Sequence, residues 1–323
     1  MPSSFRSINY VLRPAKHVER KMLRDALRRL VSFGPLETYR YIGFGSIYFG
    51  DFQLFHKSLG IADMISIEHA GNEARVNFNR PYRSIDLKFG ESGYILRNLS
   101  GWDQKTILWL DYDGPLNRAA LTDIDTFCSR AVPGSVLVVT VNVEPGRVQD
   151  KYSLLDQLKR LVDSDDHITS KVPATIRSAD LAGWGLARVS RRIIVNQIKE
   201  TLVNRGGGQD PSKRPQYQQL FHFHYADGAR MMTTGGVVYA EEQGAALSNC
   251  QFQLLPFVRL DDDDDSAFQI VVPQLTYREL HHLDKQLPLL SGTELAAEGI
   301  PKGDLENYAK IYQYHATLAE TEV

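Results

Sequence analysis

Cysteine, long apolar runs and net charge are all scarce in this sequence, and each scarcity excludes a class of protein. Only Cys128 and Cys250 occur among 323 residues, too few for a disulfide framework or a cysteine-rich zinc site. No stretch reaches the roughly 18 consecutive apolar residues that a membrane-spanning helix needs. The N-terminus lacks the apolar segment of a secretory signal. These absences predict a cytoplasmic protein with no membrane partner.

The formal net charge of −2 gives the whole molecule no attraction to nucleic acid. Basic side chains nevertheless gather in residues 1–31, which hold eight Lys/Arg against two Asp/Glu. Apolar residues recurring at three and four predict a helix over 13–31. Its basic face has two interpretations. It either meets phosphates or, as we favour, forms the solvated outer face of a helix that packs over the sheet and closes a ligand site. The residues concerned are Arg13, Lys16, Arg20, Lys21, Arg24, Arg28 and Arg29.

Five short apolar runs follow this helix, and most of them are separated by segments long enough for a crossover. The predicted strands are residues 39–44, 64–69, 84–89, 106–111 and 135–142. Helical patterns occupy residues 51–62 and 117–131 between them. Strands rich in Ile, Val and Leu that alternate with helices are typical of buried parallel sheets. The pattern therefore predicts an α/β, Rossmann-like, doubly wound and mostly parallel sheet.

In the second half of the sequence the predicted strands and helices alternate less regularly. Helices are predicted over 151–162 and 188–204, and Asp227-Gly228 between two β-rich runs predicts an antiparallel hairpin. Residues 252–259 and 268–272 predict a further strand pair. We expect the acidic run between them, residues 261–265, to be a solvated hairpin tip, because like charges repel one another.

The chain is expected to have three parts. They are a basic helical segment (1–35), a Rossmann-like domain (36–245) and a C-terminal extension with a β-hairpin and helices (246–323). His222 and His224 alternate on one strand face, where two histidines can share a metal. We favour ordinary strand histidines, because no third ligand is placed by spacing, and no metal site is predicted.

Polar and glycine residues stand where three predicted strands end. Gly43-Phe44-Gly45-Ser46 closes the first strand, Glu68 the second, and Asp111 the fourth. Nucleotide-like ligands bind beyond the carboxyl ends of parallel strands. Glycine lets the backbone approach such a ligand, and a carboxylate accepts both ribose hydroxyl protons. The turn is neither GxGxxG nor GxxxxGK[ST], which weakens a dinucleotide or triphosphate interpretation.

Asp111 and Asp113 lie two residues apart, so a continued strand would point both to one face. Two carboxylates can bind a metal, or one can act as a base. The alternative is a strand end with an aspartate capping the next helix. Both residues are candidate catalytic groups.

The series YIGFGS, MISIEH, LKFGES and ILWLDYDG resembles motifs I to IV of the class I S-adenosylmethionine-dependent methyltransferases. Residues 8–145 are also similar to a bacterial O-methyltransferase-like group. The resemblance implies S-adenosylmethionine as cofactor and Asp111 near the methyl group. Tyr41 stands where many members have an acidic residue. The implied cofactor-binding residues are Gly43, Phe44, Gly45 and Ser46 for methionine and ribose, Glu68 for the ribose hydroxyls, and Glu91 and Ser92 beside adenine.

The expected function is therefore S-adenosylmethionine-dependent methyl transfer, with oxygen as the default acceptor atom and the acceptor molecule open. One alternative is a catalytically silent cofactor-binding sensor or interaction protein in a bacterial multi-gene system, such as a defence system. Another is a nucleic-acid methyltransferase guided by the basic helix and residues 205–216. A second copy of the chain or an operon-encoded protein is a candidate partner.

Overall fold

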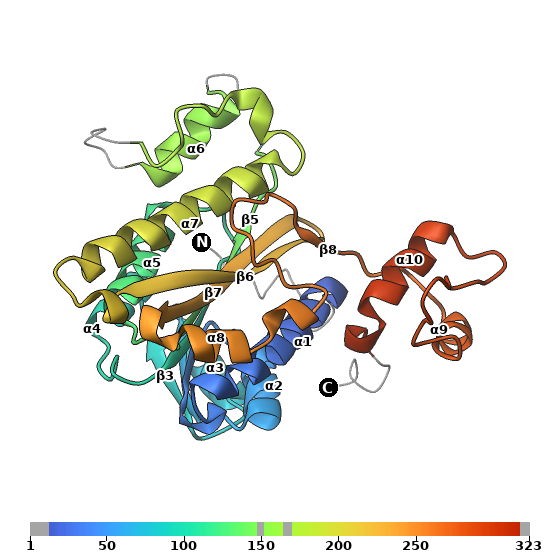
Figure 1. Ribbon diagram of the computed structural model, residues 1–323, viewed down its shortest axis with the longest axis horizontal. Helices are drawn as coiled ribbons and strands as arrows, with labels where there is room; N and C mark the ends of the chain where they lie inside the picture. The colour runs from blue at the N-terminus through green and yellow to red at the C-terminus, as the bar shows by residue number, and fades with distance from the viewer. Residues whose placement is uncertain (1–12, 147–151, 164–169, 317–323) are drawn as a thin grey trace.

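The computed structural model describes residues 13–146, 152–163 and 170–316. Its centre is an eight-stranded sheet in the order β3-β2-β1-β4-β5-β7-β6-β8, with helices on both faces (Figure 1). Strands β1 to β5 are parallel and confirm the five predicted strands. Their bounds are Arg40–Gly43 (β1), Asp63–Glu68 (β2), Ile85–Phe89 (β3), Thr106–Asp111 (β4) and Val136–Asn142 (β5).

The predicted hairpin is also confirmed. Strands β6 (Pro215–Ala226) and β7 (Arg230–Ala240) are antiparallel, and β7 lies between β5 and β6. Since β7 runs against both neighbours, β6 is parallel to β5. The tip of the hairpin at Asp227 therefore lies at the carboxyl edge of the sheet, where β1, β4 and β5 also end.

Two layers of helices cover the sheet and divide its core. One layer contains α1 (Pro14–Arg28), α2 (Gly50–Leu59) and α8 (Gly244–Asn249). The other contains α4 (Ser92–Asn98), α5 (Arg118–Arg130), α6 (Leu154–Val162) and α7 (Gly185–Gly206). Helix α3 (Glu73–Asn79) follows β2. No helix of the described residues is long and apolar enough to cross a membrane.

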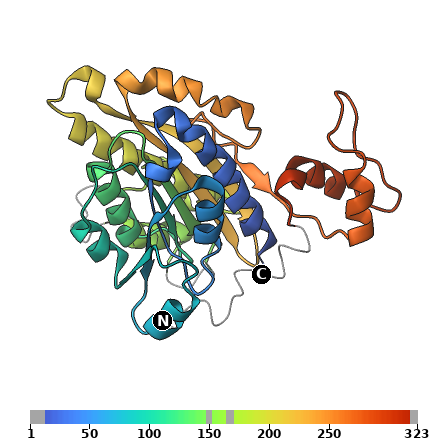
Figure 2. The ribbon, with the colours of Figure 1, turned by 90° about the horizontal axis from the view of Figure 1, so that it is seen from below.

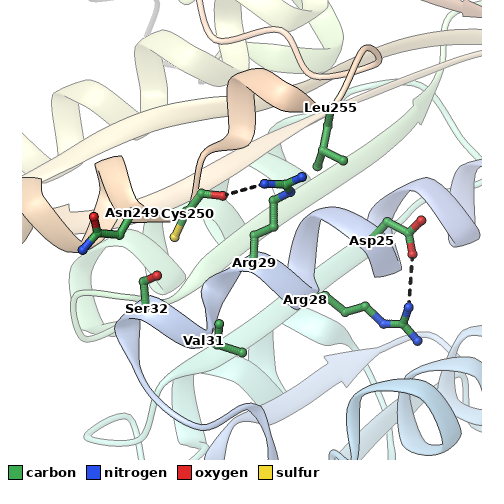
Figure 3. Close-up of a pocket in the computed structure, with 8 residues that line it drawn as sticks. All are labelled: Asp25, Arg28, Arg29, Val31, Ser32, Asn249, Cys250 and Leu255. Carbon is green, nitrogen blue, oxygen red and sulfur yellow. Dashed lines mark hydrogen bonds and ion pairs between the residues drawn. The ribbon is translucent and has the colours of Figure 1, made fainter.

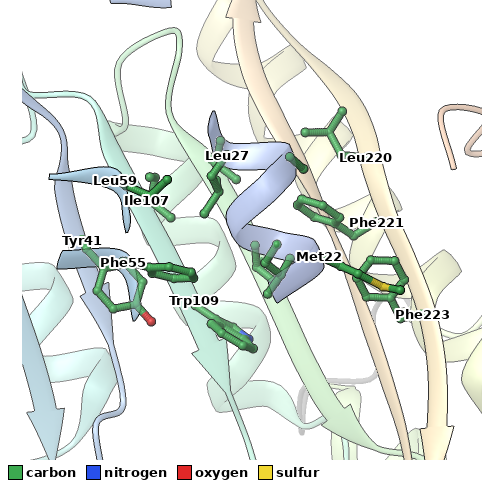
Figure 4. Close-up of a cluster of buried hydrophobic side chains, with 14 of the residues drawn as sticks. Met22, Leu27, Tyr41, Phe55, Leu59, Ile107, Trp109, Leu220, Phe221 and Phe223 are labelled. Atoms are coloured by element: carbon green, nitrogen blue, oxygen red, sulfur yellow. The ribbon is translucent and has the colours of Figure 1, made fainter. Parts of the chain in front are cut away.

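Helix α1 crosses the sheet on its first face. Met22 and Leu27 pack against aromatic and aliphatic side chains of β4 and β6, among them Trp109 and Phe223 (Figure 4). The backbone N–H groups of Ala15 and Lys16 donate to the carboxylate of Asp227 at 3.3 and 3.0 Å. A carboxylate at a helix N-terminus satisfies free N–H groups and complements the helix dipole. The hairpin tip thus fixes the start of α1 at the carboxyl edge.

The predicted strand over 252–259 is wrong. This segment begins with a 3-10 helix (Phe252–Leu254) after Gln251, whose φ of 49° is left-handed and interrupts extended backbone. Pro256, which has no N–H to donate, follows in the same segment. Residues Phe268–Ile270 do form a strand, β8, but it pairs in parallel with β6.

The acidic run is not a hairpin tip, because residues 252–259 directly before it form no strand. Asp261, Asp263 and Asp264 are exposed, as predicted, whereas the other two aspartates pair with α7. The Asp265 carboxylate pairs with Arg191 at 2.8 Å and also with Arg192, and Asp262 pairs with Lys199 at 2.7 Å. Arg191 is 1% exposed, and a buried guanidinium requires an anionic partner. Asp262 and Asp265 therefore neutralise basic side chains of α7.

Beyond β8 the chain forms α9 (Tyr277–Asp284) and α10 (Lys302–Ile311), which project from the body of the molecule (Figures 1 and 2). They share a small core of Leu283, Leu295, Leu305 and Tyr308. Ile311, the last residue of α10, and Tyr314 belong instead to the core under α1.

Candidate functional site

The turn after β1 is packed so tightly that it needs its glycines. A Cβ on Gly43 would lie 2.5 Å from the Tyr41 hydroxyl oxygen, and one on Gly45 would lie 2.5 Å from the Phe49 ring. Ser46 has a left-handed φ of 55°, which closes the turn. Because Gly43 and Gly45 carry no side chain, the turn presents its backbone at the carboxyl edge of the sheet.

Glu68 joins the end of β2 to this turn. Its Oε1 accepts hydrogen bonds from the Ser46 N–H at 3.0 Å and from the Ser66 hydroxyl at 2.6 Å. The Ser66 oxygen in turn accepts the Gly45 N–H at 3.0 Å. Burial raises the pKa of Glu68 to about 7 despite these hydrogen bonds. The structure therefore brings together the glycine turn and Glu68.

The predicted adenine-side residues have different surroundings. Glu91 is exposed at the N-cap of α4, whereas the Ser92 hydroxyl donates to the Asp123 carboxylate of α5. The Tyr112 hydroxyl donates to the same oxygen at 2.6 Å, and its ring contacts Phe44 edge to face. Sequence reasoning missed Asp123. The available signal was a carboxylate on the otherwise apolar buried face of residues 117–131.

Asp111 and Asp113 are not brought together. Asp113 is exposed two residues beyond the end of β4, while the Asp111 carboxylate turns towards α1. Asp111 Oδ1 lies 2.7 Å from Lys16 Nζ. The described residues thus give these two aspartates separate environments, unlike a shared strand face.

Lys16 corrects the prediction of a solvated basic face on α1. It is 0% exposed, and its Nζ lies 2.7 Å from Glu19 and 3.2 Å from the Tyr225 hydroxyl. The ammonium also sits 4.4 Å from the centre of the Trp109 ring. Glu19 is equally buried, and burial raises its pKa although Lys16 opposes the shift. Charged residues of α1 therefore face the sheet as well as solvent.

Tyr41 occupies the position at which an acidic residue was expected, and a carboxylate reaches the same place from α2. The Tyr41 hydroxyl donates to Asp51, which is buried in the first turn of α2. Burial raises the pKa of Asp51, while the positive charge of Arg20 on α1 opposes this. A buried carboxylate thus lies beside Tyr41, although β1 itself supplies none.

A hollow of about 410 Å³ lies at the far end of α1 (Figure 3). Arg29 donates there to the carbonyl oxygen of Cys250, and Arg28 pairs with Asp25 at 3.8 Å. The helix starts at the carboxyl edge and runs away from it, so this hollow is separate from the glycine turn.

The strand order, the inserted antiparallel β7 and the carboxylate beside the glycine turn define a class of protein. They are the features of the Rossmann-like class I methyltransferase fold. Residues 8–323 match the family described as putative O-methyltransferase, and the chain belongs to this family. No curated protein matches the sequence.

Solved structures show only distant likeness. Trm1 from Pyrococcus horikoshii in complex with S-adenosyl-L-methionine is 10% identical, with a TM-score of 0.41 over 71% of this chain and 57% of that one. LepI in complex with SAM is 14% identical, with a TM-score of 0.35 over 65% of this chain and 45% of that one. The chain spans about half the length of these two proteins, and the fold assignment rests on the strand order described above.

Proposed function

We propose that this protein is an S-adenosylmethionine-dependent O-methyltransferase whose cofactor binds at the glycine turn. The observation that carries the proposal is the Glu68 carboxylate, held beside the turn by Ser46 and Ser66. A carboxylate in this position accepts hydrogen bonds from ribose hydroxyls. Family membership and neighbours solved with S-adenosylmethionine support the same cofactor.

Two buried polar atoms near the turn fit a polar ligand. Ser46 Oγ and Asp123 Oδ1 have no hydrogen-bond partner among the described residues, and such atoms are costly to bury unsatisfied. Gly43, Phe44, Gly45 and Ser46 would border the methionine and ribose portions. We assign the adenine side to Glu91 and Ser92, with Asp123 behind them as an acceptor for an amino group.

The cofactor supplies a methyl group that its sulfonium already activates, so the protein has mainly to align the acceptor and receive its proton. Asp111 ends β4 beside β1, and we assign it to the acceptor side of the site. Oxygen is the proposed acceptor atom because the family carries that description.

A nucleic-acid acceptor has weaker support. Lys16 and Lys21 of the basic helix are buried, at 0% and 8% exposure, and only part of the basic charge of α1 remains for phosphates. A silent cofactor-binding protein would share the same site, and transfer of a labelled methyl group to an extract of small molecules separates it from the enzyme.

Calorimetric titration with S-adenosylmethionine tests the cofactor site. We expect Glu68→Ala to weaken binding at least about tenfold, equivalent to roughly 1.4 kcal/mol. Glu242→Gln, an exposed glutamate in a 3-10 helix after β7, is the matched control and should bind like the wild type. Equal affinities for wild type and Glu68→Ala would refute the ribose assignment.

A further inference from the structure

The start of α1 places a charged group inside the protein next to the proposed acceptor side. We call Lys16, Glu19 and Asp111 the α1 triad. The ammonium of Lys16 lies 2.7 Å from a carboxylate oxygen of each partner. The side chains of Lys16 and Glu19 are 1% and 0% exposed, whereas that of Asp111 is 24% exposed. Asp111 is thus the member of the triad that is accessible from outside the protein.

Stability alone does not explain this arrangement. Desolvating three ionisable groups costs several kcal/mol each, and well-packed apolar residues of similar size are often at least as stable. The triad also holds two carboxylates for one ammonium, so its formal charge is −1. Such a group has room for one more proton, and perturbed clusters of this kind concentrate at functional sites.

Several further contacts fix the triad in place. Asp227 anchors the backbone of Lys16, and Thr233 of β7 donates to Glu19. Tyr225 of β6 accepts a hydrogen bond from the Lys16 ammonium. The hydroxyl of Thr140 on β5 accepts a hydrogen bond from Trp109 of β4 and contacts the Thr233 hydroxyl of β7. Residues of four strands and of α1 therefore determine the position of Lys16.

We propose that the α1 triad is the proton acceptor of the methyl-transfer site, an inference that rests on the proposed function. Asp111 receives the proton of the acceptor hydroxyl at Oδ2, because Oδ1 binds Lys16. The O–H bond breaks, its electron pair stays on the acceptor oxygen, and the proton bonds to Asp111. Lys16 and Glu19 are positioning residues that hold the carboxylate at the end of β4.

Other charged groups surround the triad without removing its excess negative charge. Their formal charges balance, with two positive and two negative groups, and the two tyrosines are neutral. They come from α1, β1, α2, β6 and the hairpin tip, and they are Arg13, Arg20, Tyr41, Asp51, Tyr225 and Asp227.

Proton release on ligand binding tests the proposal without an acceptor. Titrations in buffers of different ionisation enthalpy would compare S-adenosylmethionine with its demethylated product S-adenosylhomocysteine. The titrations are made at acidic pH, at which the triad of the free protein holds one additional proton. The positive sulfonium next to the triad favours release of that proton, so the methylated ligand should release more protons than the product. Both ligands contain the ribose, and the contribution of Glu68 therefore cancels in the difference.

Glu19→Gln brings the triad to zero formal charge, and we expect it to lose at least half of this difference in proton release. Asp111→Asn should lose it as well, which keeps the test available if one variant does not fold. Glu242→Gln should keep the full difference. An unchanged difference in a folded Glu19→Gln or Asp111→Asn protein overturns the triad proposal alone, whereas failure of both ligands to bind the wild type overturns the proposed function with it.

Discussion

Each face of the sheet carries an ion cluster around one buried cation, and the two clusters differ in composition. On the α7 face, Arg191 and Arg192 share Asp265, and Arg191 also donates to Gln219. On the α1 face, one lysine lies between two carboxylates. Arginine cannot lose its proton in a protein. Burial opposes the effect of Arg192 and Arg191 on Asp265, but their hydrogen bonds hold its pKa below the usual value, whereas burial raises the pKa of Glu19. The ion pairs of the first cluster therefore keep their charges, whereas the second cluster can bind or release a proton.

The largest expected effect would come from the α7 face. Asp265→Asn leaves Arg191 buried without its anion, and we expect the free energy of unfolding to fall by about 3 to 4 kcal/mol. Because arginine stays charged, the loss should be similar at pH 5.5 and pH 8. Urea unfolding at both pH values measures it. A loss that disappears at one pH would show that the two clusters behave alike.

Lys16→Met on the α1 face should instead be sensitive to pH. Burial raises the pKa of Glu19 and the Lys16 ammonium opposes this, so the pKa of Glu19 in the folded state rises further without the ammonium. Groups of this kind favour the folded state at low pH and lose that contribution as the pH rises through their folded pKa. We expect a loss of about 3 kcal/mol at pH 8 and of about 1 kcal/mol at pH 5.5. Equal losses at the two pH values would contradict the contrast between the faces.

We expect the ionised Glu68 carboxylate to lower the stability of the ligand-free protein while it strengthens cofactor binding. Its pKa is raised to about 7, so its contribution to stability is present below about pH 4.5 and is lost as the pH rises through 7. Glu68→Gln should therefore stabilise the ligand-free protein by about 2 kcal/mol at pH 8, with little change at pH 5. The same variant should bind S-adenosylmethionine more weakly. Thermal unfolding with and without the cofactor checks both parts, and lower stability at pH 8 would count against a buried carboxylate.

The smallest effect concerns the strand histidines beneath α7. Burial lowers the pKa of His222 to about 3 and that of His224 to about 4, and Trp184 stacks on His224. A depressed histidine pKa means that stability is lost as the pH falls below about 6.5, since the unfolded chain then binds the proton. His224→Gln should reduce the stability lost between pH 7 and pH 5 by about 1 kcal/mol. An unchanged acid-unfolding profile would place His224 in contact with solvent.

Much of the fold was predictable because its signals are local. Strands β1 to β5 are apolar runs, and the Asp227-Gly228 turn predicts the hairpin. The meeting of the glycine turn and Glu68 was also predictable, because neighbouring parallel strands end at the same edge. The strand predicted over 252–259 does not form, because the apolar content of the segment is typical of a strand while the backbone at Gln251 is left-handed.

The α1 triad could not be predicted from the sequence pattern. Lys16 and Asp111 are 95 residues apart, and nothing local distinguishes Lys16 from the other basic residues of α1. Its burial depends on Asp227, which fixes the helix start from a hairpin 211 residues away. For Asp123 the helical pattern of 117–131 offers a local signal, but its partners Ser92 and Tyr112 lie on two other segments. Long-range polar contacts depend on the assembled sheet.

We propose that S-adenosylmethionine binds between the glycine turn and Glu68, with its methyl group towards Asp111. A crystal structure with S-adenosylhomocysteine tests this most directly. We expect the ribose hydroxyls within hydrogen-bond distance of the Glu68 carboxylate and the sulfur on the Asp111 side of the Gly43–Ser46 turn. A ligand bound elsewhere, for example in the hollow beside Arg29, would contradict the account.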